Sequence, residues 1–326
     1  MTEKYSQPYP NPSGEHRDIF FDVPAWQRCG ALMAEHFTLQ QTPTLLLDMD
    51  GVVLQSDSLF EHRLTTPDII PALADLEKQG VMLGAATSRS TPALDYLRGL
   101  GLAMQGPAIL EEGQKFLQGE HEHHIALPGH KDFIDSVKET FTSHPRHAPS
   151  WQDVQNYAKE GEMKFCTGNF QWQGELCTYF WFYYHNGSSY DREILQTVFE
   201  PTLQSLAYQQ GLDFENDVAV GVSRMIVDNL AIVTIKGRRN GEPIHKGIAA
   251  QRFMRPPWVF VADGFGDMPL AEFTKTHPQG TVIGIEGNLD VSDEVPQFLH
   301  HANAVIKNPD EFVQALSYTS TLLRKN

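Results

Sequence analysis

The amino-acid sequence predicts an α/β fold whose core is a doubly wound parallel sheet. Short apolar runs alternate with helical stretches at both ends of the chain. In these runs, for example at residues 45–47, apolar residues do not alternate with polar ones, which predicts strands buried on both faces. Acidic residues directly follow two of the runs, and ligands bind at that end of the strands in such sheets.

The alternation defines the core elements in order. The expected strands cover residues 44–49, 81–86, 107–110, 257–262, 281–285 and 304–306. The expected helices cover residues 67–79, 91–100, 245–254, 268–276, 293–301 and 309–323. Pro67 suits the start of the first of these helices and Gly80 its end. Repeated strand–helix units favour parallel strands, so we expect a Rossmann-like core.

The pattern changes in the middle of the chain. Helical stretches at 129–143 and 191–210 alternate there with β-rich stretches: KFCTGNF, ELCTYFWFYY, DVAVGVS and LAIVTIK. This predicts an inserted α+β cap domain at 113–240, which splits the core into 44–112 and 241–326. The aromatic run at 179–184 alternates faces as a strand, so one face would pack on cap helices and the other could stack on a sugar.

Residues 1–43 are expected to be an N-terminal extension with a short helix. The first twenty residues are polar and rich in proline, which predicts a loose segment. Asp22 and Pro24 then suit a helix start. One apolar face follows, formed by Trp26, Cys29, Met33 and Phe37. This face would pack on the protein itself or on a second copy in a homo-oligomer.

Composition excludes several classes of partner. The chain has 326 residues and a formal net charge of −16, which opposes binding to nucleic acid or anionic membranes. A phosphate substrate would therefore need local cations. The three cysteines form no CxxC pair, and we find no signal peptide or membrane-length apolar run. We expect a cytoplasmic protein.

The most informative stretch is TLLLDMDGV at 44–52, where Asp48 and Asp50 end an apolar run. Residues two apart in a strand point the same way, so both carboxylates would project together at the strand end. Such a pair repels itself unless a cation or a shared proton intervenes. It therefore implies Mg²⁺ and a carboxylate nucleophile beside an acid/base, although DxD triplets also occur on solvated loops.

Four further residues join this pair. Thr87 ends the second strand, where a hydroxyl suits a phosphate oxygen or caps a helix. Lys246 begins the helix at which the core resumes, where it could neutralise a phosphate or remain solvated. Asp263 and Asp267, in ADGFGD, follow another apolar strand, where they suit a hard cation or an Asx turn.

In this order the motifs resemble those of the haloacid dehalogenase-like phosphatase superfamily over residues 44–326. DMDGV matches its first motif, Thr87 in AATSRS its second, Lys246 its third and DGFGD its fourth. An insert between the second and third motifs is that superfamily's type-two cap. The HKG restart and the ending HHANAVIKNPDEFVQAL are most similar to the Cof-type sugar-phosphate phosphatases.

The resemblance implies a role for each site residue. Asp48 would be the nucleophile and Asp50 the acid/base, with an aspartyl-phosphate intermediate. The implied Mg²⁺ ligands are Asp48, the backbone carbonyl of Asp50, Asp263 and Asp267. The implied phosphate-binding residues are Thr87, Ser88 and Lys246, and the candidate substrate contacts are Arg89, Glu112 and Arg224.

The resemblance leaves three functions to weigh. The leading one is a Mg²⁺-dependent phosphatase acting on a small phosphorylated sugar or related metabolite. A sugar phosphomutase would use the same aspartate pair. A catalytically silent binding protein would have lost charged residues, yet the whole charged set is present. The cluster at 121–124, HEHH, is expected to be an exposed polar loop and not a metal site.

Overall fold

We describe a computed structural model of the chain, covering residues 23–55, 62–159, 164–167, 174–183, 195–225, 230–286 and 298–325. The predicted loose segment at 1–20 lies outside these residues, as does most of the expected helix at 293–301. No helix among the described residues is long and apolar enough to cross a membrane.

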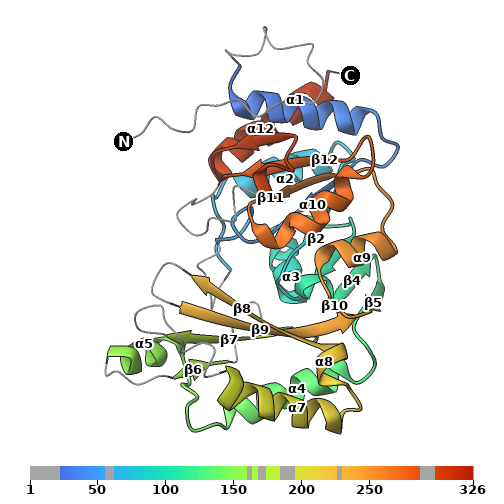
Figure 1. Ribbon diagram of the computed structural model, residues 1–326. Helices are drawn as coiled ribbons and strands as arrows, with labels where there is room; N and C mark the ends of the chain where they lie inside the picture. Colours follow the sequence, from blue (N-terminus) through green and yellow to red (C-terminus); the bar gives the residue numbers. More distant parts are fainter. Residues whose placement is uncertain are drawn as a thin grey trace.

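Eight strands of the described residues form the core sheet (Figure 1). In spatial order they are β13 (Ala304–Ile306), β12 (Thr281–Ile285), β11 (Val259–Ala262), β1 (Thr44–Leu47), β2 (Met82–Ala86), β3 (Ala108–Leu110), β4 (Lys115–Gln118) and β5 (His121–His124). From β13 to β3 all pairings are parallel, whereas β4 and β5 pair antiparallel at one edge. The doubly wound α/β core is confirmed, and the strand order reverses between β1 and β11.

The central parallel strands β1, β11 and β12 are buried on both faces, as their apolar runs predict. In β1, Leu45 and Leu47 belong to one hydrophobic cluster and Leu46 to the other. Helices α1 (Ala25–Thr38), α2 (Ile69–Glu77), α3 (Thr91–Gly99) and α12 (Pro309–Leu323) contribute to the first cluster. Helices α9 (Lys246–Phe253) and α10 (Met268–Lys275) contribute to the second. A sheet covered on both sides needs no polar alternation.

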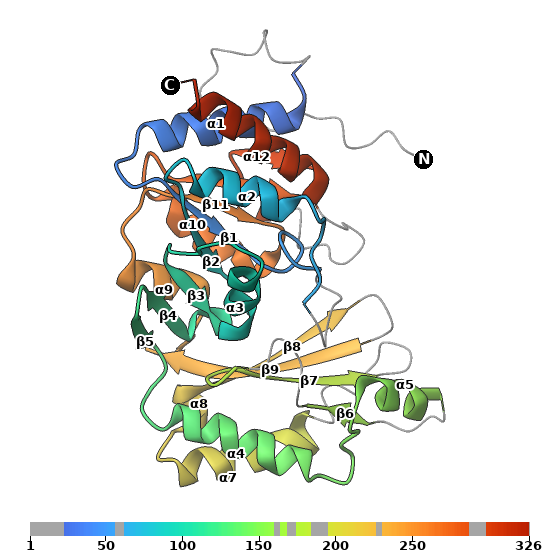
Figure 2. The same cartoon turned by 180° about the vertical axis from the view of Figure 1, so that it is seen from behind.

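The N-terminal helix α1 packs on the core of its own chain. Its predicted apolar face joins the first hydrophobic cluster, with Trp26 edge-on to the Tyr318 ring of α12 at 5.8 Å. Gly30 lets the two helices approach closely, because a Cβ there would lie 2.7 Å from the Ala315 carbonyl oxygen. Figure 2 shows α1 and α12 side by side above the sheet. The sequence leaves open whether this face packs on the protein itself or on a second copy. In the structure it packs on α12 of the same chain.

The inserted segment forms a second sheet, with the order β10-β9-β7-β6 and with β8 also paired to β9. Its strands are β6 (Phe165–Cys166), β7 (Thr178–Tyr183), β8 (Val218–Met225), β9 (Leu230–Arg239) and β10 (Glu242–Pro243). Its helical elements are α4 (His130–Thr142), α5 (Trp151–Lys159), the π-helical turn Leu195–Phe199, α7 (Glu200–Gln209) and α8 (Phe214–Asp217). This is the α+β content that the sequence predicts.

Strand alternation gives the cap sheet one face toward its own helices. Phe180 of β7 lies 5.1 Å from the ring of Phe141 in α4 and 5.0 Å from that of Phe199. Figures 1 and 2 both show the sheet between the core and helices α4 and α7. The opposite face of the sheet is therefore turned toward the core. Tyr179 on that face is 4% exposed, and residue 184 of the aromatic run lies outside the described part.

The assignment of strands to the two sheets contradicts the expected start of the cap at residue 113. β4 and β5 belong to the core sheet, and β10 belongs to the cap sheet. The prediction that HEHH forms a loop is also wrong, because these residues form the edge strand β5. All four of them are exposed, as expected. The change of pattern at 113 instead marks two antiparallel strands at the edge of the core sheet, where β5 is exposed and is not covered on both faces like the parallel strands.

Burial of His130 in the cap gives a first prediction. Its Nε2 lies 3.1 Å from the Leu176 carbonyl oxygen, and burial lowers the pKa of His130 to about 4. The unfolded chain, with a His pKa near 6.5, therefore takes up this proton first. Cap stability should be complete above about pH 6.5 and fall toward pH 4, by up to about 1.4 kcal/mol per pH unit.

His130→Gln keeps an N–H donor without that titration, so its urea-unfolding free energy should depend less on pH between 7 and 4 than that of the wild type. His121→Gln at an exposed position is the matched control. Equal pH slopes for wild type and His130→Gln would contradict the prediction.

Candidate active site

The sequence-predicted carboxylates meet where the strand order reverses. Asp48 follows β1 and Asp263 follows β11, and the two strands are paired with Leu47 opposite Val261. On its other side β1 pairs with β2, with Leu47 opposite Ala85, which brings Thr87 to the same edge. In open α/β sheets the crevice at this reversal is the usual ligand site.

Asp48 is held in a fixed orientation at this edge. Its Oδ1 accepts a hydrogen bond from the Met49 backbone N–H at 2.8 Å and another from Lys246 Nζ at 3.1 Å. The side chain is almost completely buried. Burial and the charge of Asp267 raise the pKa of Asp48 well above its ordinary value.

Lys246 links two of the carboxylates. It begins α9, is 4% exposed, and its Nζ lies 2.5 Å from Asp267 Oδ1 as well as 3.1 Å from Asp48 Oδ1. Burial by itself would lower its pKa, but the charges of Asp267 and Asp48 raise the pKa of Lys246 above its ordinary value. The ammonium is therefore charged in the site and is not the solvated lysine of the alternative interpretation.

Three carboxylates fit a divalent cation. Asp48, Asp263 and Asp267 each offer an oxygen within 4.8 Å of the other two. Burial and the charges of Asp48 and Asp50 raise the pKa of Asp263 well above its ordinary value, and burial raises that of Asp267 to about 6. When all three carboxylates are ionised, Lys246 balances one of their charges and two remain for a bound cation, whereas without a cation the raised pKa values favour protonation. Oxygen ligands of this kind suit Mg²⁺.

Gly51 leaves room for one of these carboxylates. It has φ +73°, and a Cβ on it would lie 1.7 Å from Asp263 Oδ2. The glycine of the DMDG stretch therefore serves two purposes, a left-handed turn and the close approach of Asp263.

Asp50 is bound to an arginine rather than to the three-carboxylate group. Arg89 donates to Asp50 Oδ1 from Nε at 2.8 Å and from Nη2 at 2.6 Å, and the Ser88 hydroxyl lies 3.2 Å from Asp50 Oδ2. Arg89 is fully buried and also contacts the Gln55 carbonyl oxygen and His62 Nδ1. In this structure Arg89 thus orients Asp50, whereas the sequence suggested a substrate contact.

Thr87 lies in the turn between β2 and α3, at the same edge of the sheet as Asp48. The Thr87 hydroxyl is fully buried and accepts the Arg89 backbone N–H at 3.1 Å. The N-cap of α3 is Ser90, so the alternative role of Thr87 as the cap is wrong.

The remaining candidates lie toward the cap. Glu112 follows β3 and its Oε2 lies 3.5 Å from Lys236 Nζ of β9. Arg224 pairs with Ala231 between β8 and β9, and its side chain lies outside the described part. Sequence reasoning did not single out His62 or Lys236. The only available signal for Lys236 was its position at the end of the alternating strand LAIVTIK.

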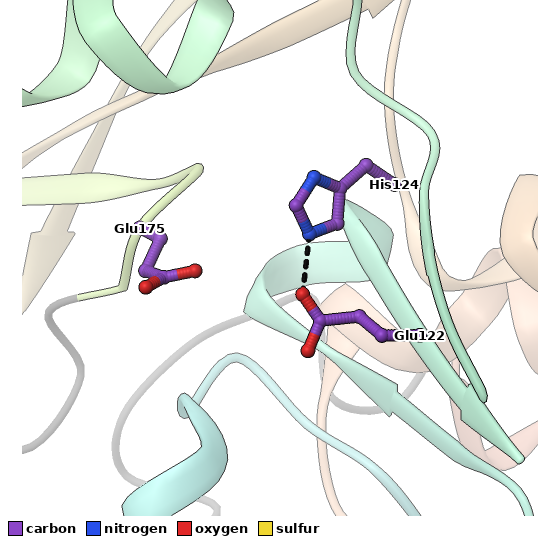
Figure 3. A group of neighbouring side chains, drawn as sticks. All are labelled: Glu122, His124 and Glu175. Atoms are coloured by element: carbon purple, nitrogen blue, oxygen red, sulfur yellow. Dashed lines mark hydrogen bonds and ion pairs between the residues drawn. The ribbon is translucent and has the colours of Figure 1, made fainter. Parts of the chain in front are cut away.

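A second group of possible metal ligands lies at the sheet edge. Figure 3 shows Glu122 and His124 of β5 facing Glu175, with His124 Nε2 2.6 Å from Glu122 Oε1. Lys115 Nζ lies 3.1 Å from Glu175 and 3.4 Å from Glu122, and Lys131 Nζ lies 3.4 Å from Glu175, so two ammonium groups balance these two exposed carboxylates. We interpret the group as an ion-pair network that ties the edge of the core to the cap.

The close packing of Gly51 gives a second prediction. Gly51→Ala should lower the free energy of unfolding by more than the about 1–2 kcal/mol that a left-handed φ costs a side chain. Gly80→Ala is the matched control, since Gly80 has φ +84° with nothing within 4 Å of a built Cβ. Urea unfolding measures both, and an equal loss in the two variants would rule out the contact with Asp263.

Comparisons with known proteins bear on the fold. No protein-family model and no curated protein matches the chain. Among solved structures, the C-terminal domain of trehalose-6-phosphate phosphatase from C. albicans matches with a TM-score of 0.50 and 12% identity, over 90% of this chain and 96% of that one. At this identity the likeness concerns the fold alone.

Two further solved structures are similar to a lesser degree. Trehalose-6-phosphate phosphatase from Aspergillus fumigatus matches with a TM-score of 0.48 and 12% identity, over 91% of this chain and 98% of that one. A sugar phosphatase of haloacid dehalogenase subclass IIB matches with a TM-score of 0.45 and 15% identity, over 83% and 95%. The fold is the one that the sequence resemblance predicts, a doubly wound core with an inserted cap.

Proposed function

We propose that this chain, which has the haloacid dehalogenase-like fold, is a Mg²⁺-dependent phosphatase acting on a small phosphorylated sugar or related metabolite. One observation carries the proposal: Asp48, Asp263, Asp267 and Lys246 converge at the reversal of strand order. A phosphate site in an acidic protein needs local cations: Lys246 is one, and a divalent cation held by the three carboxylates would be the other.

Asp48 is the nucleophile in this proposal. An oxygen of its carboxylate attacks phosphorus, and the bond between phosphorus and the ester oxygen breaks, which leaves an aspartyl-phosphate. Its fixed orientation by Met49 and Lys246 supports this role, because positioning contributes much of the rate in phosphoryl transfer.

Asp50 is the acid and base. It gives a proton to the departing ester oxygen, then takes one from the water that attacks phosphorus and releases inorganic phosphate and free Asp48. Arg89 holds Oδ1 of Asp50 by two hydrogen bonds, which fixes the direction of the carboxylate. We therefore assign Arg89 to positioning Asp50, together with Ser88.

Lys246 and Thr87 hold the oxygens of the transferred phosphoryl group. A bound Mg²⁺ would be held by Asp48, Asp263, Asp267 and the backbone carbonyl of Asp50, and it would neutralise negative charge on the phosphoryl oxygens. The cap sheet faces the core, which supports a role of the cap in covering the leaving group and excluding water.

The nucleophile assignment gives a third prediction. Asp48→Asn should reduce phosphate release to background, because an amide does not form the acyl-phosphate. Phosphate is measured over a panel of sugar and polyol phosphates with Mg²⁺, with an equivalent change at the exposed Asp132 of α4 as control. Clear turnover by Asp48→Asn, or isomerisation of a sugar phosphate by the wild type without free phosphate, would refute the proposed hydrolysis.

The metal assignment gives a fourth prediction. In the presence of EDTA, Asp263→Asn should melt at a higher temperature than the wild type, because one of three crowded charges is removed. A gain of about 1 kcal/mol corresponds to about 2 °C in a chain of this size. Mg²⁺ should stabilise the wild type by about 3 kcal/mol at 100 times its Kd, and should stabilise Asp263→Asn much less.

Differential scanning calorimetry with Mg²⁺ and with EDTA measures both effects. The assignment of Asp263 as a metal ligand would be contradicted if Asp263→Asn melted at a lower temperature than the wild type in EDTA. It would also be contradicted if Mg²⁺ raised the melting temperature of the variant as much as that of the wild type.

A further inference from the structure

The orientation of Asp50 depends on Arg89, whose side chain is completely buried. Two N–H groups of Arg89 donate to the same oxygen, Oδ1 of Asp50, at 2.8 Å from Nε and 2.6 Å from Nη2. Oδ2 of Asp50 is therefore the oxygen left to carry the proton in the proposed reaction, with the Ser88 hydroxyl 3.2 Å away. How well Asp50 transfers that proton depends on how firmly the guanidinium is held.

Two further acceptors hold the guanidinium. Its Nη2 lies 3.2 Å from the Gln55 carbonyl oxygen, and its Nη1 lies 3.1 Å from His62 Nδ1. Because the five N–H donors of a guanidinium are fixed in one plane, acceptors at different nitrogens determine its orientation. A buried N–H group that loses its acceptor is unfavourable, so loss of one of these acceptors would favour rotation or displacement of the guanidinium.

His62 contacts Arg89 as a neutral acceptor. An arginine side chain can only donate, so His62 Nδ1 accepts this bond and the ring proton lies on Nε2. Burial and the charge of Arg89 lower the pKa of His62 below its ordinary value, which favours the same neutral form. A neutral ring orients the guanidinium without competing with Asp50 for its positive charge, as a carboxylate at this position would.

The loop that carries His62 is itself held in place. Leu54 and Leu64 form an antiparallel bridge, which pairs the segment containing the Gln55 carbonyl with the segment containing His62. The His62 ring also lies 5.0 Å from the ring of Tyr96 in α3. Both acceptors of the guanidinium thus belong to one paired loop that is anchored on the core.

We propose that His62 is a positioning residue, which acts through Arg89 to hold Asp50 in the orientation for proton transfer. The three side chains form a continuous series of contacts, with 3.1 Å between His62 and Arg89 and 2.6 Å between Arg89 and Asp50. This inference rests on the proposed phosphatase function and adds to it a residue that lies between the first and second motifs.

Loss of this support should affect a difficult leaving group most. Asp50 protonates the departing oxygen in the proposed reaction, and general acid catalysis of this kind contributes about 10²–10⁴-fold to a rate. The alkoxide of a sugar or polyol needs that proton, whereas 4-nitrophenolate leaves as a stable anion and needs it little. The two leaving groups therefore distinguish a misdirected Asp50 from a general loss of folded protein or of metal.

The test compares kcat/KM of the full-length protein with Mg²⁺ for two substrates. One is the sugar or polyol phosphate that the wild type turns over fastest, and the other is 4-nitrophenyl phosphate. His62→Phe keeps a ring beside Tyr96 but removes the acceptor. It should lower kcat/KM about tenfold or more for the first substrate and less than about threefold for the second.

His62→Asn is the conservative variant, because its carbonyl oxygen is a neutral acceptor close to the position of Nδ1. The ratio of the two kcat/KM values should stay within about threefold of the wild type in this variant. His62→Leu, smaller than the native ring, is a second variant without an acceptor and should behave like His62→Phe. His121→Asn, at an exposed position on β5, is the matched control.

A double-mutant cycle tests whether His62 acts through Arg89. Arg89→Met removes the guanidinium and should itself lower kcat/KM for the sugar or polyol phosphate. In that background His62→Phe should have less than about a twofold further effect, because the contact that it breaks is already absent. Independent and additive losses from the two changes would show that His62 acts by another route and would overturn the proposal.

The remaining outcomes also decide. Equal losses for both substrates in His62→Phe and His62→Leu would show a structural role alone and overturn the proposal, as would unchanged kinetics in both. The same selective loss in His62→Asn would overturn the role of the neutral acceptor. No phosphate release by the wild type from either substrate would instead refute the proposed function.

Discussion

The dominant physical constraint on the candidate active site is the crowding of three carboxylates, which repel one another. Asp48, Asp263 and Asp267 are brought within contact distance at the edge of the sheet, and Lys246 balances one charge of the three. Strand β1 and strand β11 supply them because these neighbours flank the reversal of strand order. Such crowding costs free energy in the absence of a cation, so the group favours binding of a divalent cation.

Around this centre the structure separates two electrostatic environments. Asp50 points to Arg89 and Ser88, outside the three-carboxylate group, although it lies only two residues from Asp48. Alternation along the strand was expected to place both aspartates together. β1 ends at Leu47 instead, so strand alternation does not extend through Asp48 and Asp50, and the two carboxylates have different partners.

Much of the fold could be predicted because its signals are local. The apolar runs of β1 and β11 reflect burial on both faces, and Asn308 and Pro309 mark the start of α12 by capping. The expected start of the cap at residue 113 is wrong for β4 and β5, because β4 pairs with β3 of the core sheet and β5 pairs with β4. Strand partners are chosen by long-range packing, which the local pattern does not record.

The sequence by itself determined the catalytic candidates Asp48, Lys246 and Asp263, because motif order and strand-end position are properties of the chain. The tertiary structure alone decided which groups face one another. It placed Arg89 under Asp50, the ammonium of Lys236 against Glu112, and α1 on α12. These contacts join residues far apart in the sequence, and only the packing of sheet, helices and cap brings them together.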